Sequence, residues 1–353
     1  MSIAESTRPV GWGILGTARI ASKVGRAIYD ARGARLVAVA SRALPRARAW
    51  IDQHTLGHAA ADGKSAFLSA SATVAGYGSY LELLRQPDID AVYIPLPPSL
   101  HCEWTCCAAQ HGKHVLCEKP LALNLAEAER MQDACQSADR QLMDGVMWVH
   151  HERTAAMQRV LSSGGLGRLR RVTSAFSFNA REFHADNIRF QRELGGGALG
   201  DVGWYCVRAT LWAFDDLPER VFATARCERD VDMNLSATLW FRGERMAAFD
   251  CGFDTTWRKW IEIAGSEGSL VCDDFVNPWD AARARFWTHD SQGKATQHDF
   301  PGSIQEVRMI EKFCELVRSG ATDSTWPAAS IATQRVCDAL GRSARSGHVV
   351  DVT

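Results

Sequence analysis

Lys119, Asp201 and Tyr205 have side chains that could together handle a proton and steady negative charge on an oxygen atom. A phenol has an ordinary pKa of about 10, so it exchanges protons poorly at neutral pH unless a nearby cation lowers that pKa. Lys119 would be this cation if the two predicted domains of the chain meet. Asp201 would orient a substrate hydroxyl or the Lys119 ammonium group. Asp201 and Tyr205 are four residues apart in a helix-like segment, which places them on one face. The alternatives are a helix-capping carboxylate and a half-buried core aromatic.

A second candidate site is the run Gly16-Thr17-Ala18-Arg19-Ile20-Ala21, between an apolar strand-like run and a helix-like run. Its pattern is the dinucleotide fingerprint Gly-x-Gly-x-x-Gly/Ala with alanine at the middle glycine. Gly16 permits the tight turn, and the N-terminus of the following helix presents N–H groups to a pyrophosphate. Ala18 implies a looser approach of the backbone to the phosphate. The alternative is an ordinary strand–helix turn.

The end of the next strand-like run indicates which dinucleotide would bind. NAD sites usually place an acidic residue there, which accepts hydrogen bonds from the ribose hydroxyls. This chain has Ser41 and Arg42 at that place, with Arg46 one turn further on. An acid would repel a ribose 2′-phosphate, whereas a serine can donate to it and an arginine can pair with it. We therefore expect NADP(H) rather than NAD(H). The alternative is a serine and arginines that cap a helix in solvent.

The elements that must position these residues alternate along the first part of the chain. Apolar strands are predicted at 10–15, 36–41, 90–95, 113–118 and 141–146, and helices at 18–31, 45–54, 99–110 and 125–138. Continuous apolar strands separated by helices are typical of a parallel sheet covered on both faces. The weakly periodic stretch 57–76 interrupts this rhythm, and we expect it to be a surface insertion.

After about residue 150 the pattern changes to alternating apolar and polar residues. One helix is predicted at 151–163, strands at 170–178, 220–228, 235–241, 246–253, 259–265 and 269–273, and final helices at 304–319 and 327–345. Such alternation favours a largely antiparallel, open sheet with one covered face. The predicted fold class is therefore α/β, with a dinucleotide-binding Rossmann domain over 1–147 and a substrate-binding and oligomerisation α/β domain over 148–353.

Composition excludes several classes of protein. The 353 residues are 46% hydrophobic and 23% charged, as in ordinary globular proteins. Because 40 basic residues face 41 acidic ones, no bulk positive field would attract nucleic acid or a membrane surface. Only His101, Cys102 and Cys106 approach zinc-ligand spacing, so we expect reduced thiols and no metal. The N-terminus carries no export signal, and we expect a cytoplasmic protein.

Three later segments carry a resemblance to a known family: Tyr93–His101 (YIPLPPSLH), Gly112–Pro120 (GKHVLCEKP) and Gly195–Tyr205 (GGGALGDVGWY). Together with the turn at Gly16, they resemble the glucose–fructose oxidoreductase / inositol dehydrogenase (Gfo/Idh/MocA) family. The likeness runs over nearly the whole chain and is greatest to the NADP-dependent branch that contains dimeric dihydrodiol dehydrogenase and D-xylose 1-dehydrogenase.

This resemblance implies pyridine-nucleotide redox chemistry at a sugar, polyol or dihydrodiol-like carbinol or carbonyl, on a Rossmann domain followed by an α/β domain. It also implies roles for individual positions. The residues expected to line the cofactor cleft are Pro95, Leu96, Pro97 and His101, and those expected near the nicotinamide ribose are Glu118 and Lys119. Trp148 falls where relatives have a substrate-pocket aromatic, and relatives often carry arginine close to the place of His150.

Two rival activities exist within the same fold. One is a glycosidase that keeps its dinucleotide and oxidises the sugar transiently. The other is a non-catalytic sugar sensor or regulator. Such regulators usually lose the lysine or the proton-handling residue, and both are present here as Lys119 and Tyr205.

The second domain carries two further expectations. Large apolar residues at alternate strand positions, such as Leu239 and Phe241, predict a sheet face that needs a partner, and hence a homodimer or higher homo-oligomer. Of the 12 tryptophans, Trp204 and Trp257 could reach a sugar face. The adjacent His150 and His151 point to different faces of a helix, so we expect no shared metal. We expect one of them, taken as His150, to line the substrate pocket and the other to be solvated or to cap a helix.

Overall fold

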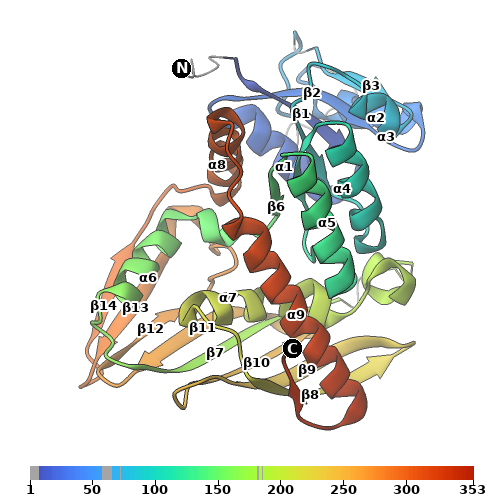
Figure 1. Ribbon diagram of the computed structural model, residues 1–353. Helices are drawn as coiled ribbons and strands as arrows, with labels where there is room; N and C mark the ends of the chain where they lie inside the picture. Colours follow the sequence, from blue (N-terminus) through green and yellow to red (C-terminus); the bar gives the residue numbers. More distant parts are fainter. Residues whose placement is uncertain (1–7, 58–65, 72, 181–182, 185) are drawn as a thin grey trace. The chain divides into compact units, whose positions relative to one another are not determined.

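The computed structural model describes residues 8–57, 66–71, 73–180, 183–184 and 186–353 (Figure 1). The chain forms two compact units. The first comprises Met1–Leu121, Ala126–Gly145 and Glu306–Pro327, and the second Ala122–Leu125, Val146–Gln305 and Ala328–Thr353. The predicted domain boundary between residues 147 and 148 stays a prediction. Glu306–Pro327 groups with the first unit, although its place in the sequence assigns it to the second domain.

The first unit contains a six-stranded parallel sheet in the order β3-β2-β1-β4-β5-β6. Its strands are β1 (Val10–Leu15), β2 (Ala34–Ala40), β3 (Ala75–Tyr77), β4 (Ala91–Ile94), β5 (His114–Cys117) and β6 (Leu142–Asp144). Its helices are α1 (Arg19–Asp30), α2 (Leu44–His54), α3 (Tyr80–Leu84), α4 (His101–Gln110), α5 (Leu125–Ser137) and α8 (Gln305–Ser319). The strand order turns back at β1 and β4, as in a doubly wound Rossmann sheet, and this part of the predicted fold class is confirmed.

Alternate residues of β1 show that helices cover both faces of this sheet. Trp12 is fully buried, and its ring centroid lies 5.1 Å from that of Phe313 in α8. The next residue, Gly13, points to the opposite face, because successive strand side chains alternate. A Cβ atom added to Gly13 would lie 2.6 Å from a methyl carbon of Leu83 in α3. The strand is therefore buried from both sides, which explains its continuous apolar sequence.

The predicted surface insertion at 57–76 is wrong for the part of it that the structure describes. Residues 58–65 and 72 lie outside the described residues. Phe67 and Leu68 are buried, with 4% and 1% of their surface exposed, and Leu68 pairs with Thr55 in an isolated bridge. Phe67 packs beside the rings of Trp50 and Tyr29. A short apolar pair among small polar residues is too brief to show a period, and its burial depends on partners distant in sequence.

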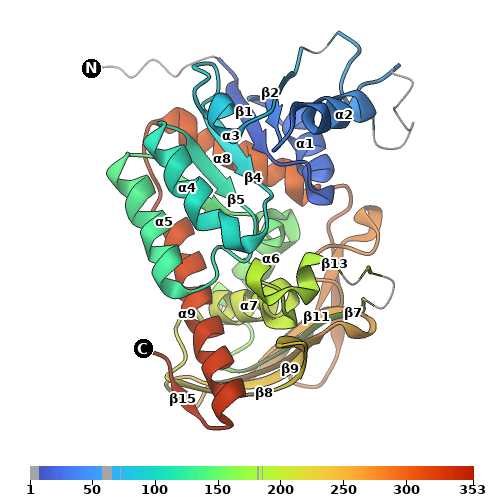
Figure 2. The same cartoon turned by 90° about the vertical axis from the view of Figure 1, so that its right-hand side faces the viewer.

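The second unit is built on a nine-stranded sheet in the order β14-β13-β12-β11-β7-β10-β9-β8-β15. Neighbouring strands are antiparallel except for the parallel pair β7 and β10. The strands are β7 (Leu169–Asn179), β8 (Arg220–Glu228), β9 (Val231–Trp240), β10 (Met246–Gly252), β11 (Asp254–Gly265), β12 (Gly268–Cys272), β13 (Arg285–Asp290), β14 (Ala295–Asp299) and β15 (Val350–Asp351). The helices α6 (Glu152–Ser162), α7 (Trp204–Phe214) and α9 (Thr325–Ser346) lie on the same side of it (Figure 1 and Figure 2). The largely antiparallel open sheet is confirmed.

The two residues predicted to form an uncovered sheet face point instead toward the helices. Leu239 is fully buried, and Phe241 is 4% exposed and packs its ring against Phe214 of α7 at 4.8 Å. Alternation then places Trp240 on the opposite face, where it is half-buried. Trp260 occupies the same opposite face in β11, since its neighbour Ile261 is buried under the helices. Large residues of the outer face therefore include these two tryptophans, which the sequence pattern did not separate from the inner face.

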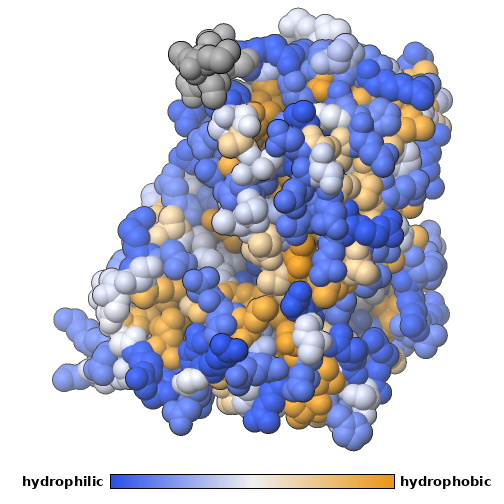
Figure 3. Space-filling view, in the orientation of Figure 1, coloured by the Kyte–Doolittle hydropathy of each residue, from blue (hydrophilic) through white to orange (hydrophobic). Residues whose placement is uncertain are grey.

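Within the described ranges, no helix combines the length and apolar character that crossing a membrane requires. Polar and charged side chains cover most of the face seen in Figure 3, with smaller apolar patches among them. All 11 cysteines are unpaired thiols, and eight of them are buried, as expected for reduced core residues.

Candidate active site

The turn after β1 has the geometry that a phosphate-binding turn needs. Gly16 has a φ of +120°, and a Cβ atom there would lie 2.9 Å from the Leu96 side chain. Glycine is therefore required on both steric and backbone grounds. The N-cap residue of α1, Ala18, offers no capping side chain, and the first turn holds no acid. Thr17 and Ile20 are partly exposed and Ala18 and Arg19 are exposed, which leaves the N-terminal N–H groups of α1 suited to an anion.

The residues predicted to select the dinucleotide lie at the same edge of the sheet. The Gly16 N–H donates to the carbonyl of Ala40, the last residue of β2, at 2.8 Å. Arg42 and Arg46 are exposed, and both lie close enough to Tyr80 to lower its pKa, although burial has the larger effect and raises it. Ser41 is only 4% exposed. The two arginines after β2 are thus accessible charged groups, as is Arg19 in the turn.

His101 does not line a cleft in this structure, because its side chain is fully buried. One ring nitrogen lies 2.8 Å from the carbonyl oxygen of Leu96, and the other lies 2.9 Å from that of Pro120. Burial lowers the pKa of this imidazole. The histidine ties the segment after β4 to the segment after β5, so its role is to position Pro95, Leu96 and Pro97 rather than to touch a cofactor.

Glu118 and Lys119 follow β5 directly. Glu118 is buried and accepts a hydrogen bond of 2.6 Å from the hydroxyl of Tyr93, a fully buried residue of β4 that the sequence analysis did not single out. Burial raises the pKa of this carboxyl, and the Tyr93 hydroxyl opposes the rise. Gly145 leaves room for it, since a Cβ atom there would lie 2.9 Å from a carboxylate oxygen of Glu118. Lys119 itself is half-buried at the start of the next turn.

In the second unit, Asp201 and Tyr205 lie on either side of a junction between two helical segments. Asp201 belongs to the π-helical turn Leu199–Gly203, and Tyr205 to the first turn of α7. Arg189 forms an ion pair of 2.5 Å with Asp201, in which their side chains are 32% and 17% exposed. No sequence pattern pointed to Arg189, because it lies in a 3-10 turn of three residues, Ile188–Phe190, which is too short to show a period. The ring of Tyr205 meets that of Phe176 edge-on at 5.3 Å.

The glycine run before Asp201 packs against the protein itself rather than leaving space for a ligand. A Cβ atom at Gly196 would lie 2.6 Å from the carbonyl oxygen of Arg189, and one at Gly197, where φ is +125°, would lie 2.1 Å from a carboxylate oxygen of Asp232. Asp232 also accepts a hydrogen bond of 2.6 Å from the Leu199 N–H, at the start of the π-helical turn. The run thus fixes the segment that carries Asp201.

Asp232 gives this segment a pH dependence. Burial raises its pKa to about 6, and the Leu199 N–H opposes the rise. The folded protein therefore binds the proton more tightly than the unfolded chain, so this contribution to stability is largest below about pH 4 and declines as the pH rises through about 6. Because the Asp232 side chain is partly exposed, solvent reduces the effect. We expect the free energy of unfolding to fall by about 2 kcal/mol over this pH range.

The matching variant is Asp232→Asn, which keeps an acceptor for Leu199 but does not titrate. The free energies of unfolding in urea, measured for both proteins at about pH 4 and about pH 7, should diverge in favour of the asparagine variant at the higher pH. The same difference between the two proteins at both pH values would show that Asp232 keeps an ordinary pKa.

The predicted substrate-pocket aromatic, Trp148, is almost completely buried at 1% exposure. It packs edge-on against Trp212 and Phe275, with ring centroids 5.3 and 5.7 Å away. His150 is half-buried beside it, and the nitrogen Nδ1 of buried His151 accepts from the Arg153 N–H and caps α6, which was one of its expected roles. Trp148 therefore lies beneath the surface, and its place in a substrate pocket stays a prediction.

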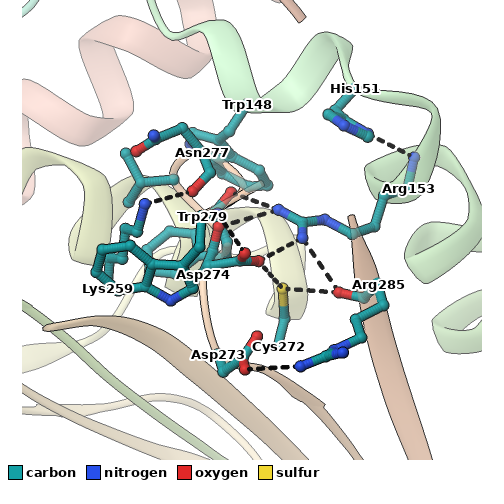
Figure 4. A network of polar contacts seen from close by, with 12 residues as sticks. Trp148, His151, Arg153, Lys259, Cys272, Asp273, Asp274, Asn277, Trp279 and Arg285 are labelled. Carbon is teal, nitrogen blue, oxygen red and sulfur yellow. Dashed lines mark hydrogen bonds and ion pairs between the residues drawn. The ribbon is translucent and has the colours of Figure 1, made fainter. Parts of the chain in front are cut away.

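A buried ion pair holds the loop that carries Phe275 (Figure 4). Arg153 and Asp274 are 1% and 6% exposed at the side chain, and the guanidinium lies 2.5 Å from the carboxylate. Arg153 also donates to the Asp274 carbonyl at 3.0 Å, and Asp274 accepts from the Trp279 N–H at 2.7 Å. The network fixes the chain from Asp274 to Trp279 and, through Phe275, one side of Trp148.

The structure thus brings the predicted residues together in two groups. Gly16, Arg42, Leu96, Glu118 and Lys119 belong to the first unit, with the turn residues and their neighbours. Asp201, Tyr205, Trp148 and His150 belong to the second unit. Joint action of Lys119 with Tyr205 stays a prediction. Trp204 cannot reach a sugar because it is fully buried, whereas Trp257 is 55% exposed.

Comparison with known families accounts for most of the chain. Residues 10–146 match the Gfo/Idh/MocA oxidoreductase family with its NAD-binding Rossmann fold. Residues 154–271 match the Gfo/Idh/MocA C-terminal domain. The first match spans the six-stranded sheet, and the second spans most of the nine-stranded sheet but not β13, β14 and β15. The resemblance carried by the sequence motifs is confirmed.

Individual relatives match over nearly their full length. The chain is 34% identical to the D-xylose 1-dehydrogenase (NADP(+)) 2 of Haloferax volcanii, over 97% of this chain and 99% of that protein. It is 31% identical to the dTDP-3,4-didehydro-2,6-dideoxy-alpha-D-glucose 3-reductase of Actinomadura kijaniata, over 98% of each. A crystal structure of the 3-ketoreductase KijD10 from Actinomadura kijaniata with NADP and TDP-benzene is similar at a TM-score of 0.84 and 29% identity, covering 95% and 98% of the two chains.

Proposed function

The chain belongs to the Gfo/Idh/MocA oxidoreductase family, and on that premise we propose that it moves a hydride between NADP(H) and a sugar, polyol or dihydrodiol-like carbinol or carbonyl. At the coarser level it is an NAD(P)-dependent oxidoreductase that acts on sugars, as its relatives are. The observation that carries the proposal is the glycine turn at Gly16, which leads into the exposed N-terminus of α1, with exposed Arg42 and Arg46 after the neighbouring strand β2.

The cofactor is NADP(H), as expected from the residues after β2 and as used by similar proteins. Gly16 and the N-terminus of α1 would hold the pyrophosphate, and the guanidinium groups of Arg42 and Arg46 would bind the ribose 2′-phosphate. When bound, the cofactor supplies or accepts hydride at its nicotinamide ring. Leu96, in the segment after β4 and held by His101, packs close to Gly16.

Removing the arginine after β2 tests this assignment. Loss of a paired arginine–phosphate contact costs about 1.5–3 kcal/mol. Arg42→Ala should therefore weaken NADPH binding by about tenfold to a hundredfold and leave NADH binding nearly unchanged. Fluorescence titration with both cofactors measures this, and Arg48→Ala, an exposed arginine further along α2, is the matched control. Equal losses for NADPH and NADH would contradict the role of Arg42.

The proton that accompanies the hydride would be handled by Tyr205. In the reducing direction, negative charge builds on the substrate oxygen, and the tyrosine hydroxyl donates its proton there. The Lys119 ammonium would stabilise the phenolate that remains, because a nearby cation favours the charged form. Asp201, whose orientation is held by Arg189 and by the packed glycine run, would orient a substrate hydroxyl.

A second candidate activity, the glycosidase that retains its dinucleotide, differs in its products. A screen of the purified protein with NADP⁺ and a panel of sugars, diols and glycosides separates the two. Accumulation of NADPH with an oxidised sugar supports the proposal. Release of a free sugar from a glycoside without net change in NADPH absorbance supports the glycosidase. Binding of sugars without either reaction would support a non-catalytic sugar sensor.

A homodimer or higher oligomer through the outer face of the nine-stranded sheet is part of the proposal. This face carries half-buried Trp240 and Trp260, and large apolar residues on an open sheet favour association. We expect light scattering at micromolar concentration to give at least twice the chain mass of 38.9 kDa. Trp260→Asp should shift the protein toward monomer. A wild-type protein that is already monomeric would contradict this assembly.

A further inference from the structure

A row of aromatic rings leads from Tyr205 to the surface of the second unit. The ring of Tyr205 meets that of Phe176 at 5.3 Å, and Phe176 lies 6.4 Å from Trp257. Trp257 in turn stacks on Phe178 at 5.0 Å, with only 24° between their planes. Phe176 and Phe178 are buried, whereas Trp257 is 55% exposed. The row therefore ends in an indole that has one face covered by Phe178 and more than half of its surface open.

The backbone of β11 sets the direction of the Trp257 side chain. The pairing of β11 with β7 changes register between Asp254 and Arg258, so Trp257 lies in a bulge. Bulges re-aim side chains and are enriched next to active sites. The Thr255 hydroxyl donates to that of Ser177 at 2.6 Å and holds the bulge against β7. Past the bulge, Arg258 binds both carboxylate oxygens of Asp250, which anchors the strand on the opposite face.

The surroundings of the row fix its rings relative to Asp201. The guanidinium carbon of Arg189 lies 5.7 Å from the centre of the Phe178 ring and 5.3 Å from that of Phe183. The same guanidinium forms the ion pair with Asp201. One residue thus contacts both the ring under Trp257 and the carboxylate proposed to orient the substrate.

The other highly exposed tryptophan has a different environment. Trp279 is also 55% exposed, but its ring covers the ammonium group of Lys259, 3.7 Å from the ring centre. That cation–π contact accounts for its position. Trp257 instead covers Phe178, so it presents a flat apolar surface one ring away from Tyr205.

We propose that Trp257 is an outer substrate subsite that stacks on a second ring carried by the sugar. The preferred substrates would then be sugars with a planar ring substituent, either an aryl aglycone or the base of a nucleotide-linked sugar. This inference rests on the proposed function, since it takes Tyr205 as the place of the reacting sugar carbon. Stacking on an exposed aromatic side chain strengthens binding by roughly tenfold and tolerates different rings.

The test compares ligands with and without a planar ring, and in the nucleotide pair the added group also contains a deoxyribose and a phosphate. Calorimetry on the NADP⁺-loaded protein gives the affinities for methyl and phenyl β-D-glucopyranoside, and for glucose 1-phosphate and dTDP-glucose. In at least one pair the ring-bearing ligand should bind roughly tenfold more tightly. Trp257→Ala should remove that preference and leave the ringless ligand unchanged, whereas Trp279→Ala should keep it. A preference within the first pair indicates an aglycone, and one within the second pair indicates a base.

Three results would overturn the subsite: equal affinities within both pairs, no binding of any of the four ligands, or a preference that survives Trp257→Ala. Thermal unfolding of both variants checks that they fold. The outcome is separable from the proposed function. If the protein oxidises free sugars with NADP⁺ but shows no ring preference, the proposed function stands and the proposed subsite at Trp257 is wrong. If the protein turns over no sugar but prefers the ring-bearing ligand through Trp257, the proposed function is wrong and the proposed subsite stands.

Discussion

Tyr205→Phe is expected to lower turnover of the true substrate by about 10²–10⁴-fold, the usual contribution of a positioned general acid. The change removes the hydroxyl and its proton and little volume, and the ring contact with Phe176 remains possible. NADPH affinity should therefore be unchanged. Steady-state kinetics together with NADPH binding by fluorescence measures both quantities. Near wild-type turnover would make Tyr205 a packing residue and direct the search for the donor to His150, Asp201 or a bound water.

Lys119→Met extends the same test. If the ammonium acts by stabilising the phenolate of Tyr205, its loss lowers turnover but adds little once the hydroxyl is gone. The double variant should then be little slower than the slower single variant, because residues that act as a unit are non-additive. Losses that multiply in the double variant would show that Lys119 and Tyr205 act separately.

Asp274→Ala is expected to lower the free energy of unfolding by about 3–5 kcal/mol, because it leaves the Arg153 guanidinium buried without its partner. The matched control is the adjacent Asp273→Ala. Asp273 is 46% exposed at the side chain and lies 4.0 Å from Arg285, so its loss should cost at most about 1 kcal/mol. Urea unfolding followed by tryptophan fluorescence measures the three proteins. Similar losses for both variants would mean that the buried pair is not what holds the loop.

Much of the first unit could be predicted because its strands are buried on both faces. The continuous apolar runs at β1, β2 and β4, each followed by a helix, allow few other arrangements. The turn at Gly16 could also be predicted, since its positive φ favours glycine. Phe67 and Leu68 were missed because two apolar residues carry no period. Phe67 is buried against the rings of Trp50 and Tyr29, and Leu68 pairs with Thr55.

Less of the fold of the second unit could be predicted from the sequence, again for a physical reason. Strands β13 and β14 near one edge of the sheet contain histidine, glutamine and aspartate, so neither alternation nor a continuous apolar run marks them. Leu239 was placed on the wrong face because alternation shows two faces without saying which one the helices cover. The partners Arg189 and Asp232 depend on contacts across 12 and 33 residues, which no local pattern encodes.

The central claim is a hydride transfer between NADP(H) and a sugar carbon, and isotope transfer tests it most directly. The protein is incubated with NADPH carrying deuterium at the transferable position of the nicotinamide and with a panel of keto and aldehyde sugars, and the products are analysed by mass spectrometry. We expect at least one sugar to gain a single deuterium at the reduced carbon, and Tyr205→Phe to slow this gain. Binding of NADPH without deuterium in any sugar would contradict it.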